Sequence, residues 1–212
     1  MLRVEKGERY EISDNSNVYL AEVSLAHKGE VVFEVVEELP LKPKIVPVTL
    51  VVALFKFDHL EWLIEKATEL GVACILPVIA IRSERGLDQA APKRIERWRR
   101  IGLEASQQSR RDVLPEIELP IKFAELLKRQ AALRLLLDET AGPEHAMLRS
   151  LPDVLPEDVL VALGPEGGWT DGEREQFILA GWKAVSLGSQ ILRAETAGIA
   201  ALAILQAGLL GK

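Results

Sequence analysis

The sequence VLVALGPEGGW at residues 159–169 decides which fold we expect. Its first five residues are apolar and predict a strand that is buried on both faces. The glycines that follow predict a loop that enters a helix. A second segment, AVSLGSQILRAET at residues 184–196, repeats this pattern of strand, glycine-containing loop and helix. In open α/β sheets, ligands bind beyond the carboxyl ends of the strands. The two loops together therefore predict a binding site for a small molecule.

The first loop lacks the common phosphate-binding patterns. A dinucleotide-binding loop needs glycine at its third position, where this chain has Glu166, and the chain contains no Gly-Lys-Ser/Thr triplet of a P-loop. Residues 164–169 contain no Lys or Arg, and no Gly-x-Ser-x-Gly nucleophile motif occurs. We therefore expect the loops to enclose a compact, non-phosphorylated ligand through backbone groups. The alternative is that the glycines only turn the chain into a helix, which Thr170 and Glu173 could cap.

The two motifs give the chain a specific resemblance to a known family. LGPEGG at residues 163–168 and LGSQILRAETA at residues 187–197 resemble, in order and in separation, the RsmE family of ribosomal RNA methyltransferases. The similarity continues upstream through EKATELG at residues 65–71 and EASQQS at residues 104–109, so it covers most of the chain. That family belongs to the knotted methyltransferase class called SPOUT.

The resemblance implies S-adenosyl-L-methionine as the cofactor and methylation at N3 of one uridine in the 16S ribosomal RNA of the small subunit. It also implies a deep trefoil knot that forms the cofactor pocket, and a homodimer that packs through the knotted carboxyl-terminal region. The residues that this resemblance assigns to cofactor binding are Leu137, Leu163, Gly164, Glu166, Gly167, Gly168, Leu187, Gly188, Ile191, Leu192 and Thr196.

Methyl transfer from a sulfonium to N3 of uridine makes two chemical demands. The methyl donor must be held in line with the nitrogen, and the nitrogen must lose its proton to expose a nucleophilic lone pair. The negative charge then spreads onto the flanking carbonyl oxygens, where a cation stabilises it. We expect Arg193 to stabilise this charge and Glu195 to accept the proton. A structural role for Glu195 stays open, because the helix dipole favours an acid in the first turn of a helix.

Two other functions are compatible with the sequence. One is a knotted methyltransferase that acts on another RNA position, such as a ribose 2′-hydroxyl, because fold similarity alone does not separate these activities. The other is a non-catalytic RNA-binding assembly factor that has kept the knot. Binding of the cofactor separates this last function from the first two, since an inactive relative need not retain that affinity.

The composition is that of an ordinary soluble globular protein, with 48% hydrophobic and 27% charged residues. Cys74 is the only cysteine and lies in an apolar run, so we expect a buried thiol without a disulfide. The three histidines are far apart in the sequence, and we expect no metal site. The longest uncharged run has 16 residues, too few for a membrane span, and the N-terminus has no apolar signal segment. We expect a cytoplasmic protein without a membrane partner.

The charge of the chain is distributed unevenly. Its net charge is −6, but residues 82–111 contain nine Arg or Lys and four Asp or Glu, a local balance of +5. Such asymmetry indicates a basic face that can bind phosphate, although a solvated charged helix face is the plainer alternative. With 5% aromatic residues, contact through base stacking is poorly supported. The residues that we expect to contact RNA are Arg82, Arg85, Arg94, Arg97, Arg100, Arg110 and Arg111.

Around the two motifs, strands alternate with helices, which predicts an α/β fold with a mostly parallel sheet and helices on both faces. We expect Asp58 to cap the first helix, and the apolar last helix to be buried on most sides. The expected strands cover residues 48–55, 73–79, 133–137, 159–163 and 184–187. The expected helices cover residues 58–70, 92–109, 121–130, 143–149, 171–180 and 195–210.

The N-terminal residues differ in character from the rest. Residues 1–36 predict short strands with a hairpin turn at residues 14–17, where the resemblance implies a small PUA-like RNA-binding β-barrel. Family members usually have further sequence before this point, so we expect the barrel to be partial. Three prolines in residues 40–47 predict a semi-rigid linker. We therefore expect a PUA-like domain at residues 1–42 and a knotted SPOUT methyltransferase domain at residues 48–212.

Overall fold

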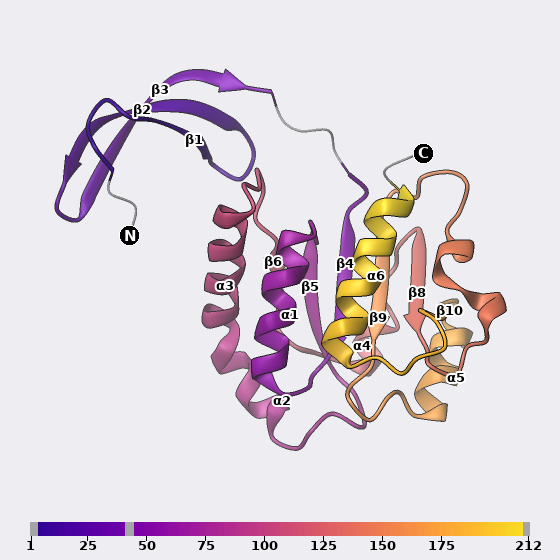
Figure 1. Ribbon diagram of the computed structural model, residues 1–212. Helices are drawn as coiled ribbons and strands as arrows, with labels where there is room; N and C mark the ends of the chain where they lie inside the picture. Colours follow the sequence, from indigo (N-terminus) through magenta and orange to yellow (C-terminus); the bar gives the residue numbers. More distant parts are fainter. Residues whose placement is uncertain (1–3, 41–44, 210–212) are drawn as a thin grey trace. The chain divides into compact units, whose positions relative to one another are not determined.

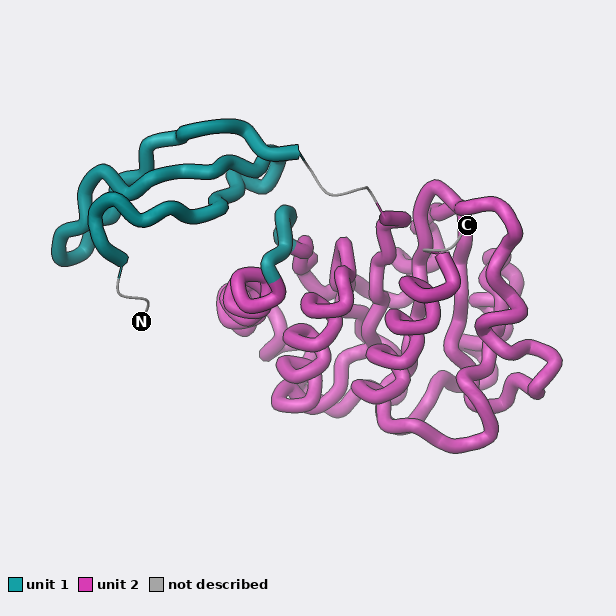
Figure 2. Tube along the Cα trace, turned by 45° about the horizontal axis from the view of Figure 1, so that its top comes forward, with its two compact units in different colours: residues 1–44, 110–114 teal, residues 45–109, 115–212 magenta. Residues whose placement is uncertain are grey.

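The computed structural model describes residues 4–40 and 45–209, and the chain divides into two compact units (Figure 2). The first unit comprises Met1–Lys44 and Arg110–Leu114, and the second comprises Ile45–Ser109 and Pro115–Lys212. Each unit has its own β-sheet. The linker expected at residues 40–47 falls partly on residues 41–44, which lie outside the described residues.

The first unit contains a three-stranded antiparallel sheet with the strand order β1-β2-β3. Its strands are β1 (Arg9–Ser13), β2 (Val18–His27) and β3 (Glu30–Leu39). The hairpin turn expected at residues 14–17 is confirmed: Oδ1 of Asp14 accepts hydrogen bonds from the backbone N–H groups of Ser16, at 2.9 Å, and of Asn17, at 2.7 Å. Asp and Asn favour such turns because their side chains hydrogen-bond the local backbone.

The second unit is built on a seven-stranded sheet in which every pairing is parallel. The strand order is β10-β8-β9-β4-β5-β6, and β7 also pairs with β5. The strands are β4 (Val48–Ala53), β5 (Cys74–Ile79), β6 (Glu116–Ile117), β7 (Ile121–Lys122), β8 (Leu133–Leu137), β9 (Val159–Leu163) and β10 (Lys183–Val185). The expectation of an α/β fold with a mostly parallel sheet is confirmed for this unit.

Helices cover both faces of this sheet, which explains its continuous apolar strands. The α-helices are α1 (Phe57–Glu69), α2 (Leu87–Ala90), α3 (Ile95–Gln108), α4 (Phe123–Leu126), α5 (Asp171–Leu179) and α6 (Ala194–Leu209). The 3-10 helices are η1 (Ala91–Arg94), η2 (Pro143–His145) and η3 (Met147–Ser150). Figure 1 shows α1, α3 and α6 together over one face of the sheet.

Alternate residues of β4 supply the two hydrophobic cores. Leu50 and Val52 belong to the larger core, which α1, α3 and α6 complete. Val51 and Ala53 belong to the smaller core on the opposite face, with Phe177 of α5 and two buried tryptophans. Because successive side chains of a strand point to opposite faces, one apolar strand serves both cores.

The lone cysteine is buried, as expected. Cys74 is 9% exposed and lies in β5. Burial, with a smaller contribution from the nearby Glu118 carboxylate, raises the pKa of the Cys74 thiol to about 12. A thiol with such a pKa stays protonated and unreactive at neutral pH.

Three expected helices differ in detail from the structure. Asp58 does not cap α1: the N-cap is Lys56, and Asp58 lies in the first turn, where the helix dipole favours an acid. The helix expected at residues 121–130 is reduced to α4, because Ile121 and Lys122 pair with the end of β5 instead. The helix expected from residue 92 becomes the short η1 before α3 begins at Ile95.

The helix expected at residues 143–149 is also wrong. Two 3-10 turns stand in its place, separated by Ala146 in an extended conformation with ψ 128°. Ala146 forms a parallel β-bridge with Ser186, and the backbone groups of His145 and Met147 hydrogen-bond Ser186 at 2.9 Å each. This pairing with a segment 40 residues away overrides the local helical pattern.

Helix α6 is less completely buried than its apolar sequence predicts. One side packs against α1 and β9, and its buried residues include Gly198, Ala201, Leu202 and Leu205. The opposite side exposes Thr196, Ala203 and Ala207. Exposed alanines cost little and favour the helix, so that an apolar composition does not require burial all round.

Gly198 allows α6 to approach α1 closely. A Cβ atom at this position would lie 2.9 Å from Cδ1 of Leu63 and 3.3 Å from Cδ2 of Leu163, both in fully packed surroundings. We predict that Gly198→Ala destabilises the protein by about 1–2 kcal/mol through overpacking, although alanine is the better helix former. The matched control is Gly172→Ala in α5, where a Cβ meets no atom within 4 Å. Chemical denaturation should show no destabilisation of the control, and equal effects in both variants would contradict this packing role.

Candidate active site

A cavity of about 670 Å³ lies in the second unit, where β8, β9 and β10 end. Volumes of this size are typical of small-molecule sites. The loop after β9 and the loop after β10 both line it, as the sequence predicts for two strands that end at one edge of a parallel sheet. Its lining residues are Lys56, His59, Leu137, Asp138, Glu139, Leu163, Gly164, Pro165, Glu166, Gly167, Gly168, Val185, Ser186, Leu187, Gly188, Gln190, Ile191, Leu192, Arg193, Ala194, Glu195 and Ala197.

The structure brings nearly all residues of the predicted site together. Of the residues that the resemblance assigned to cofactor binding, only Thr196 does not line the cavity. Thr196 lies in the first turn of α6 on its exposed side. Both predicted catalytic residues, Arg193 and Glu195, line the cavity. Their roles remain proposals, but their positions agree with them.

The loop after β9 needs glycine at one position in particular. Gly168 has a φ of +67°, which favours glycine, and a Cβ atom there would lie 2.7 Å from Oε1 of Glu139. The positive φ is the main reason for glycine here, because the Glu139 carboxylate is the flexible end of a half-exposed side chain. This observation supports the expectation that backbone groups of the loop line the site.

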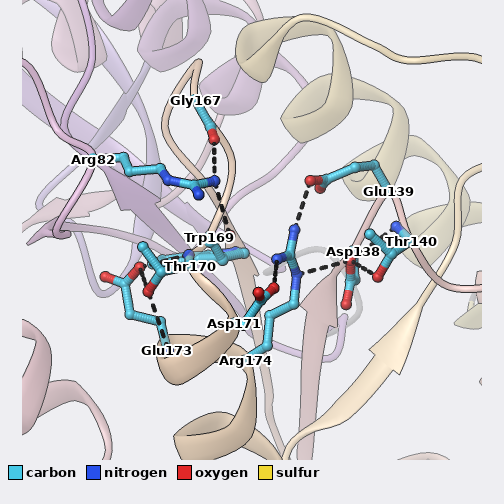
Figure 3. Close-up of polar contacts among 10 residues, drawn as sticks. All are labelled: Arg82, Asp138, Glu139, Thr140, Gly167, Trp169, Thr170, Asp171, Glu173 and Arg174. Carbon is cyan, nitrogen blue, oxygen red and sulfur yellow. Dashed lines mark hydrogen bonds and ion pairs between the residues drawn. The ribbon is translucent and has the colours of Figure 1, made fainter.

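Arg82 also contacts the loop after β9, through the backbone of that loop (Figure 3). Its Nη1 atom donates a hydrogen bond to the carbonyl oxygen of Gly167 at 2.8 Å and approaches that of Trp169 at 3.4 Å. Arg82 belongs to the loop after β5, so the contact ties two neighbouring loops together. A residue predicted to contact RNA thus also positions the wall of the cavity.

Glu173 anchors the end of the loop through three hydrogen bonds. Its side chain is fully buried and accepts from the backbone N–H of Ile81 at 2.8 Å. It also accepts from the N–H and the hydroxyl of Thr170, at 2.9 and 2.8 Å, while Thr170 caps α5 in return. The capping box expected from the sequence is therefore confirmed. It does not compete with a binding site, because it fixes the loop that lines the cavity.

A cluster of three carboxylates surrounds Arg174 at the edge of the cavity (Figure 3). Its guanidinium group contacts Asp138 at 3.2 Å, Glu139 at 2.7 Å and Asp171 at 3.0 Å. Asp138 and Glu139 also line the cavity, and Asp138 is 8% exposed. Because one arginine faces three carboxylates, this cluster carries a net negative charge. The carboxylates suit a ligand that offers hydroxyl or ammonium donors.

The loop after β10 carries the predicted cation. Gly188 has a φ of +133°, and its N–H and carbonyl groups both lie 3.2 Å from the hydroxyl of Ser186. Further along, Arg193 is exposed and, within the described residues, has no recorded ion pair. Its guanidinium group is therefore available to a ligand. Ile191 is 89% exposed and lines the same cavity.

Glu195 faces a histidine that the sequence motifs did not single out. Glu195 is 6% exposed, and its Oε1 lies 3.3 Å from Nδ1 of His59. Nδ1 is itself buried and, among the described residues, has no hydrogen-bond partner. His59 and Lys56 enter the cavity because α1 begins just after β4 ends, at the same edge of the sheet. This shared edge is the sequence signal that could have identified both residues.

The residues predicted to bind RNA are dispersed, and several are already paired. Arg97 forms two hydrogen bonds of 2.7 Å with Glu61, and Arg100 contacts Glu104 at 3.2 Å. Arg94 lies 3.5 Å from Glu61, and its guanidinium carbon is 5.4 Å from the centre of the Phe57 ring. Exposed ion pairs are weak and can exchange partners, so that phosphate could still compete for these arginines.

The other predicted RNA-binding residues have different surroundings. Arg85 is exposed on the loop after β5, as is Arg82, which holds Gly167. Arg110 and Arg111 belong to the first unit, where Nε of Arg111 donates to the carbonyl oxygen of Val113 at 3.1 Å. Burial lowers the pKa of the Arg111 guanidinium. The seven arginines thus do not form one continuous group within either unit.

Two further observations concern metals and membranes. Within residues 4–40 and 45–209, no group of three or more His, Cys, Asp or Glu side chains could hold a metal ion. No helix in the described part of the chain is long and apolar enough to cross a membrane.

A parallel α/β sheet with a cavity beyond the ends of its strands is the architecture in which α/β proteins bind small molecules. Comparison with known proteins narrows this class. The family model of the RNA methyltransferase domain matches residues 42–206. Ribosomal RNA small subunit methyltransferase E of Synechocystis is 36% identical over 98% of this chain and 68% of its own length. That of Aquifex aeolicus is 31% identical over 96% of this chain and 87% of its own length.

A solved structure agrees with these relatives. The crystal structure of ribosomal RNA small subunit methyltransferase E from Neisseria gonorrhoeae, bound to S-adenosyl methionine, is similar with a TM-score of 0.87. Its sequence identity is 30%, and the match covers 97% of this chain and 85% of that chain. The chain therefore belongs to the ribosomal RNA small subunit methyltransferase E (RsmE) family of RNA methyltransferases.

The buried Glu173 generates a prediction about the support of the cavity wall. Glu173→Ala leaves the N–H groups of Ile81 and Thr170 without an acceptor, so that the free energy of unfolding should fall by about 2–4 kcal/mol. The matched control is Glu175→Ala on the exposed side of the same helix, which should change it by less than about 0.5 kcal/mol. Urea unfolding measures both values. A loss in Glu173→Ala no larger than that of the control would show that this carboxylate does not hold the loop.

Proposed function

We propose that this chain is an S-adenosylmethionine-dependent methyltransferase that methylates N3 of one uridine in the 16S ribosomal RNA of the small subunit. One observation carries the proposal: both glycine loops of the family motif line a single cavity that also contains Arg193 and Glu195. The relative from Neisseria gonorrhoeae, which is bound to S-adenosyl methionine, supports the choice of cofactor.

The residues of the cavity fit this cofactor. Gly168 and Glu139 both line the cavity, and without a side chain at Gly168 the backbone of the loop can approach an adenine or ribose closely. Asp138 and Glu139 provide acceptors for hydroxyl or ammonium groups. When bound, the cofactor supplies an electrophilic methyl group on a sulfonium centre. Leu137, Leu163, Gly164, Glu166, Gly167, Gly168, Leu187, Gly188, Ile191 and Leu192 are the residues that we propose to enclose it.

Arg193 and Glu195 divide the remaining chemistry between them. Removal of the N3 proton leaves negative charge on the flanking carbonyl oxygens of uracil, and the unpaired guanidinium of Arg193 can stabilise it. Glu195 is the acid nearest to Arg193 in sequence and accepts the proton. Its low exposure of 6% protects the carboxylate from water, which strengthens its interactions with both a cation and a substrate.

The RNA is proposed to contact the basic residues that the sequence singles out. Arg85 and Arg193 are exposed and have no recorded ion-pair partners within the described chain, which supports direct phosphate contact. Arg94, Arg97 and Arg100 would exchange their carboxylate partners for phosphate. We further propose that Arg82 contributes positive charge to this interaction, and that Arg110 and Arg111 of the first unit also contact RNA.

The finer features of the fold also remain proposals. We propose a deep trefoil knot in a SPOUT domain at residues 48–212 and a PUA-like β-domain at residues 1–42. The antiparallel sheet of β1, β2 and β3 is compatible with a part of such a barrel. We also propose a homodimer that packs through the carboxyl-terminal region, where α6 exposes small apolar residues. The proposed location is the cytoplasm, where the ribosomal substrate is.

The first prediction of this proposal concerns the cofactor. S-adenosylmethionine should bind without RNA and raise the melting temperature, since a ligand of the folded state stabilises it by mass action. Gly168→Val should abolish this shift, because its side chain would project toward Glu139 in the space that we propose for the cofactor. Gly86→Val is the matched control, with a comparable φ of +86° but no atom near its Cβ. It should lose stability and still keep the shift. A shift retained in Gly168→Val would place the cofactor elsewhere.

The second prediction tests the mechanism through Arg193. If its charge acts only as N3 loses its proton, Arg193→Ala should lower kcat by about 10²–10³-fold and leave cofactor affinity unchanged. The defect should shrink as pH rises, because alkaline solution supplies the uridine anion directly. Arg193→Lys should restore activity only in part, since a point charge cannot reproduce the planar guanidinium. Single-turnover methyl transfer to small subunits that lack the modification measures these effects. If Arg193→Ala instead loses affinity for the cofactor and keeps normal turnover, Arg193 only lines the pocket and does not stabilise the charge.

A further inference from the structure

Arg174 is a charged residue beside the cavity to which the proposed function gives no role. It lies on α5 and does not line the cavity, but two of its partners, Asp138 and Glu139, do. Its side chain is only 16% exposed, whereas arginine side chains are mostly exposed. Burial of a charge is costly unless the charge is paired. The carboxylates therefore hold this cation, and the cation constrains them in return.

The guanidinium group of Arg174 lies between three carboxylates (Figure 3). Nε contacts Asp138 at 3.2 Å, Nη1 contacts Asp171 at 3.0 Å and Nη2 contacts Glu139 at 2.7 Å. Because the group is planar, three contacts through three different nitrogens fix its orientation. Asp138 is fixed in turn, since its Oδ1 accepts hydrogen bonds from the N–H and the hydroxyl of Thr140, at 2.9 and 2.8 Å. The donor that faces Glu139 therefore has a rigid support.

Glu139 needs such support more than Asp138 does. The side chain of Glu139 is 45% exposed, whereas that of Asp138 is 8% exposed. A half-exposed glutamate has several rotamers, and fixing one of them costs entropy. The contact with Nη2 of Arg174 selects one, in which Oε1 lies at the cavity wall beside Gly168. The other oxygen, Oε2, has no recorded partner among the described residues and can accept a hydrogen bond from a ligand.

We propose that Arg174 is a positioning residue: it holds the Glu139 carboxylate at the cavity wall, where Oε2 accepts a hydrogen bond from an O–H or N–H donor of S-adenosylmethionine. This inference rests on the cofactor of the proposed function and not on the RNA position that is methylated. It adds two residues that lie outside the two glycine motifs. The cofactor offers donors in its nucleoside part, on the ribose and adenine, and in its amino acid part, on the ammonium group.

Positioning and simple charge predict opposite effects when Arg174 is removed. S-adenosylmethionine carries a sulfonium, an ammonium and a carboxylate, so that its net charge is positive. If Arg174 acted only as a charge, its removal would leave the cluster more negative and would strengthen the binding of this cation. If Arg174 positions Glu139, its removal should weaken binding, because the ligand must then order the carboxylate itself. The direction of the change therefore distinguishes the two roles.

Calorimetry without RNA measures this direction. Arg174→Gln should raise the Kd for S-adenosylmethionine by about threefold to tenfold. Glu139→Ala should raise it by about tenfold or more, because it removes a charged acceptor. In the Glu139→Ala background, Arg174→Gln should no longer weaken binding, since no carboxylate is left to position. Arg174→Lys should restore part of the affinity, because a point charge cannot contact all three carboxylates as the planar group does.

Two ligands without net charge locate the donor. S-adenosylhomocysteine keeps the amino acid part of the cofactor, and 5′-methylthioadenosine lacks it. If Arg174→Gln weakens the binding of both ligands, the donor lies in the nucleoside part. If it weakens only the binding of S-adenosylhomocysteine, the donor is the ammonium group. An unchanged Kd for both ligands would contradict the inference, because the effect of charge is absent from these measurements.

Arg129→Gln is the matched control. Arg129 is also paired with a carboxylate, that of Glu118, and neither residue lines the cavity. This variant should keep the Kd for S-adenosylmethionine within about twofold of the wild type. Urea unfolding shows whether each variant is folded, and Arg174→Lys, which keeps the charge, gives the same comparison should Arg174→Gln not fold.

Two results would overturn the inference. One is an Arg174→Gln variant that binds S-adenosylmethionine as tightly as the wild type or more tightly. The other is an equal loss of affinity with and without the Glu139 carboxylate, because Arg174 would then act on the site as a whole. A chain that shows the expected binding but methylates another RNA position would refute the uridine assignment and support this inference. A wild type without affinity for the cofactor would overturn both.

Discussion

The site depends on the pairing of β9 along both of its edges. Val159 to Leu163 pair in parallel with β4 on one side, Val159 to Ala162 pair with β8 on the other, and β10 lies beyond β8. Parallel strands end at the same edge of a sheet, and this edge therefore collects the loops that come after β4, β8, β9 and β10. Every residue of β9 is buried, so that a polar substitution at any of these positions would lower the free energy of unfolding. The cavity exists because this strand is central.

The cavity wall is held by polar contacts that serve stability and function together. Glu173 joins the start of α5 to the loop after β5, and Arg82 joins the same loop to Gly167. The glycine loop therefore leads into a helix, as one interpretation predicts, and lines the cavity, as the other requires. A loop that lines a site must be positioned precisely enough to meet its ligand, and the capping box does this. Each partner in this hydrogen-bond network depends on the others, so that the loss of one contact weakens the rest.

Features that arise from local patterns could be predicted from the sequence. The apolar strands, the hairpin at residues 14–17 and the capping box of Thr170 are local features, and all are present. Contacts between distant segments were missed. Ser186 pairs with Ala146 and prevents a helix at residues 143–149. Glu61 of α1 forms an ion pair with Arg97 of α3, which lies 36 residues further along the chain. His59 reaches the cavity for the same reason, because its place depends on the order of strands in the sheet.

The central claim is that two glycine loops, Arg193 and Glu195 form one site for methyl transfer to uridine. The most direct test incubates small ribosomal subunits that lack the modification with the chain and labelled S-adenosylmethionine. Nucleoside mass spectrometry of the 16S ribosomal RNA then identifies the product. The account predicts label in 3-methyluridine at a single position, with the Arg193→Ala variant strongly impaired. Label on a ribose hydroxyl, or cofactor binding without any transfer, would contradict it.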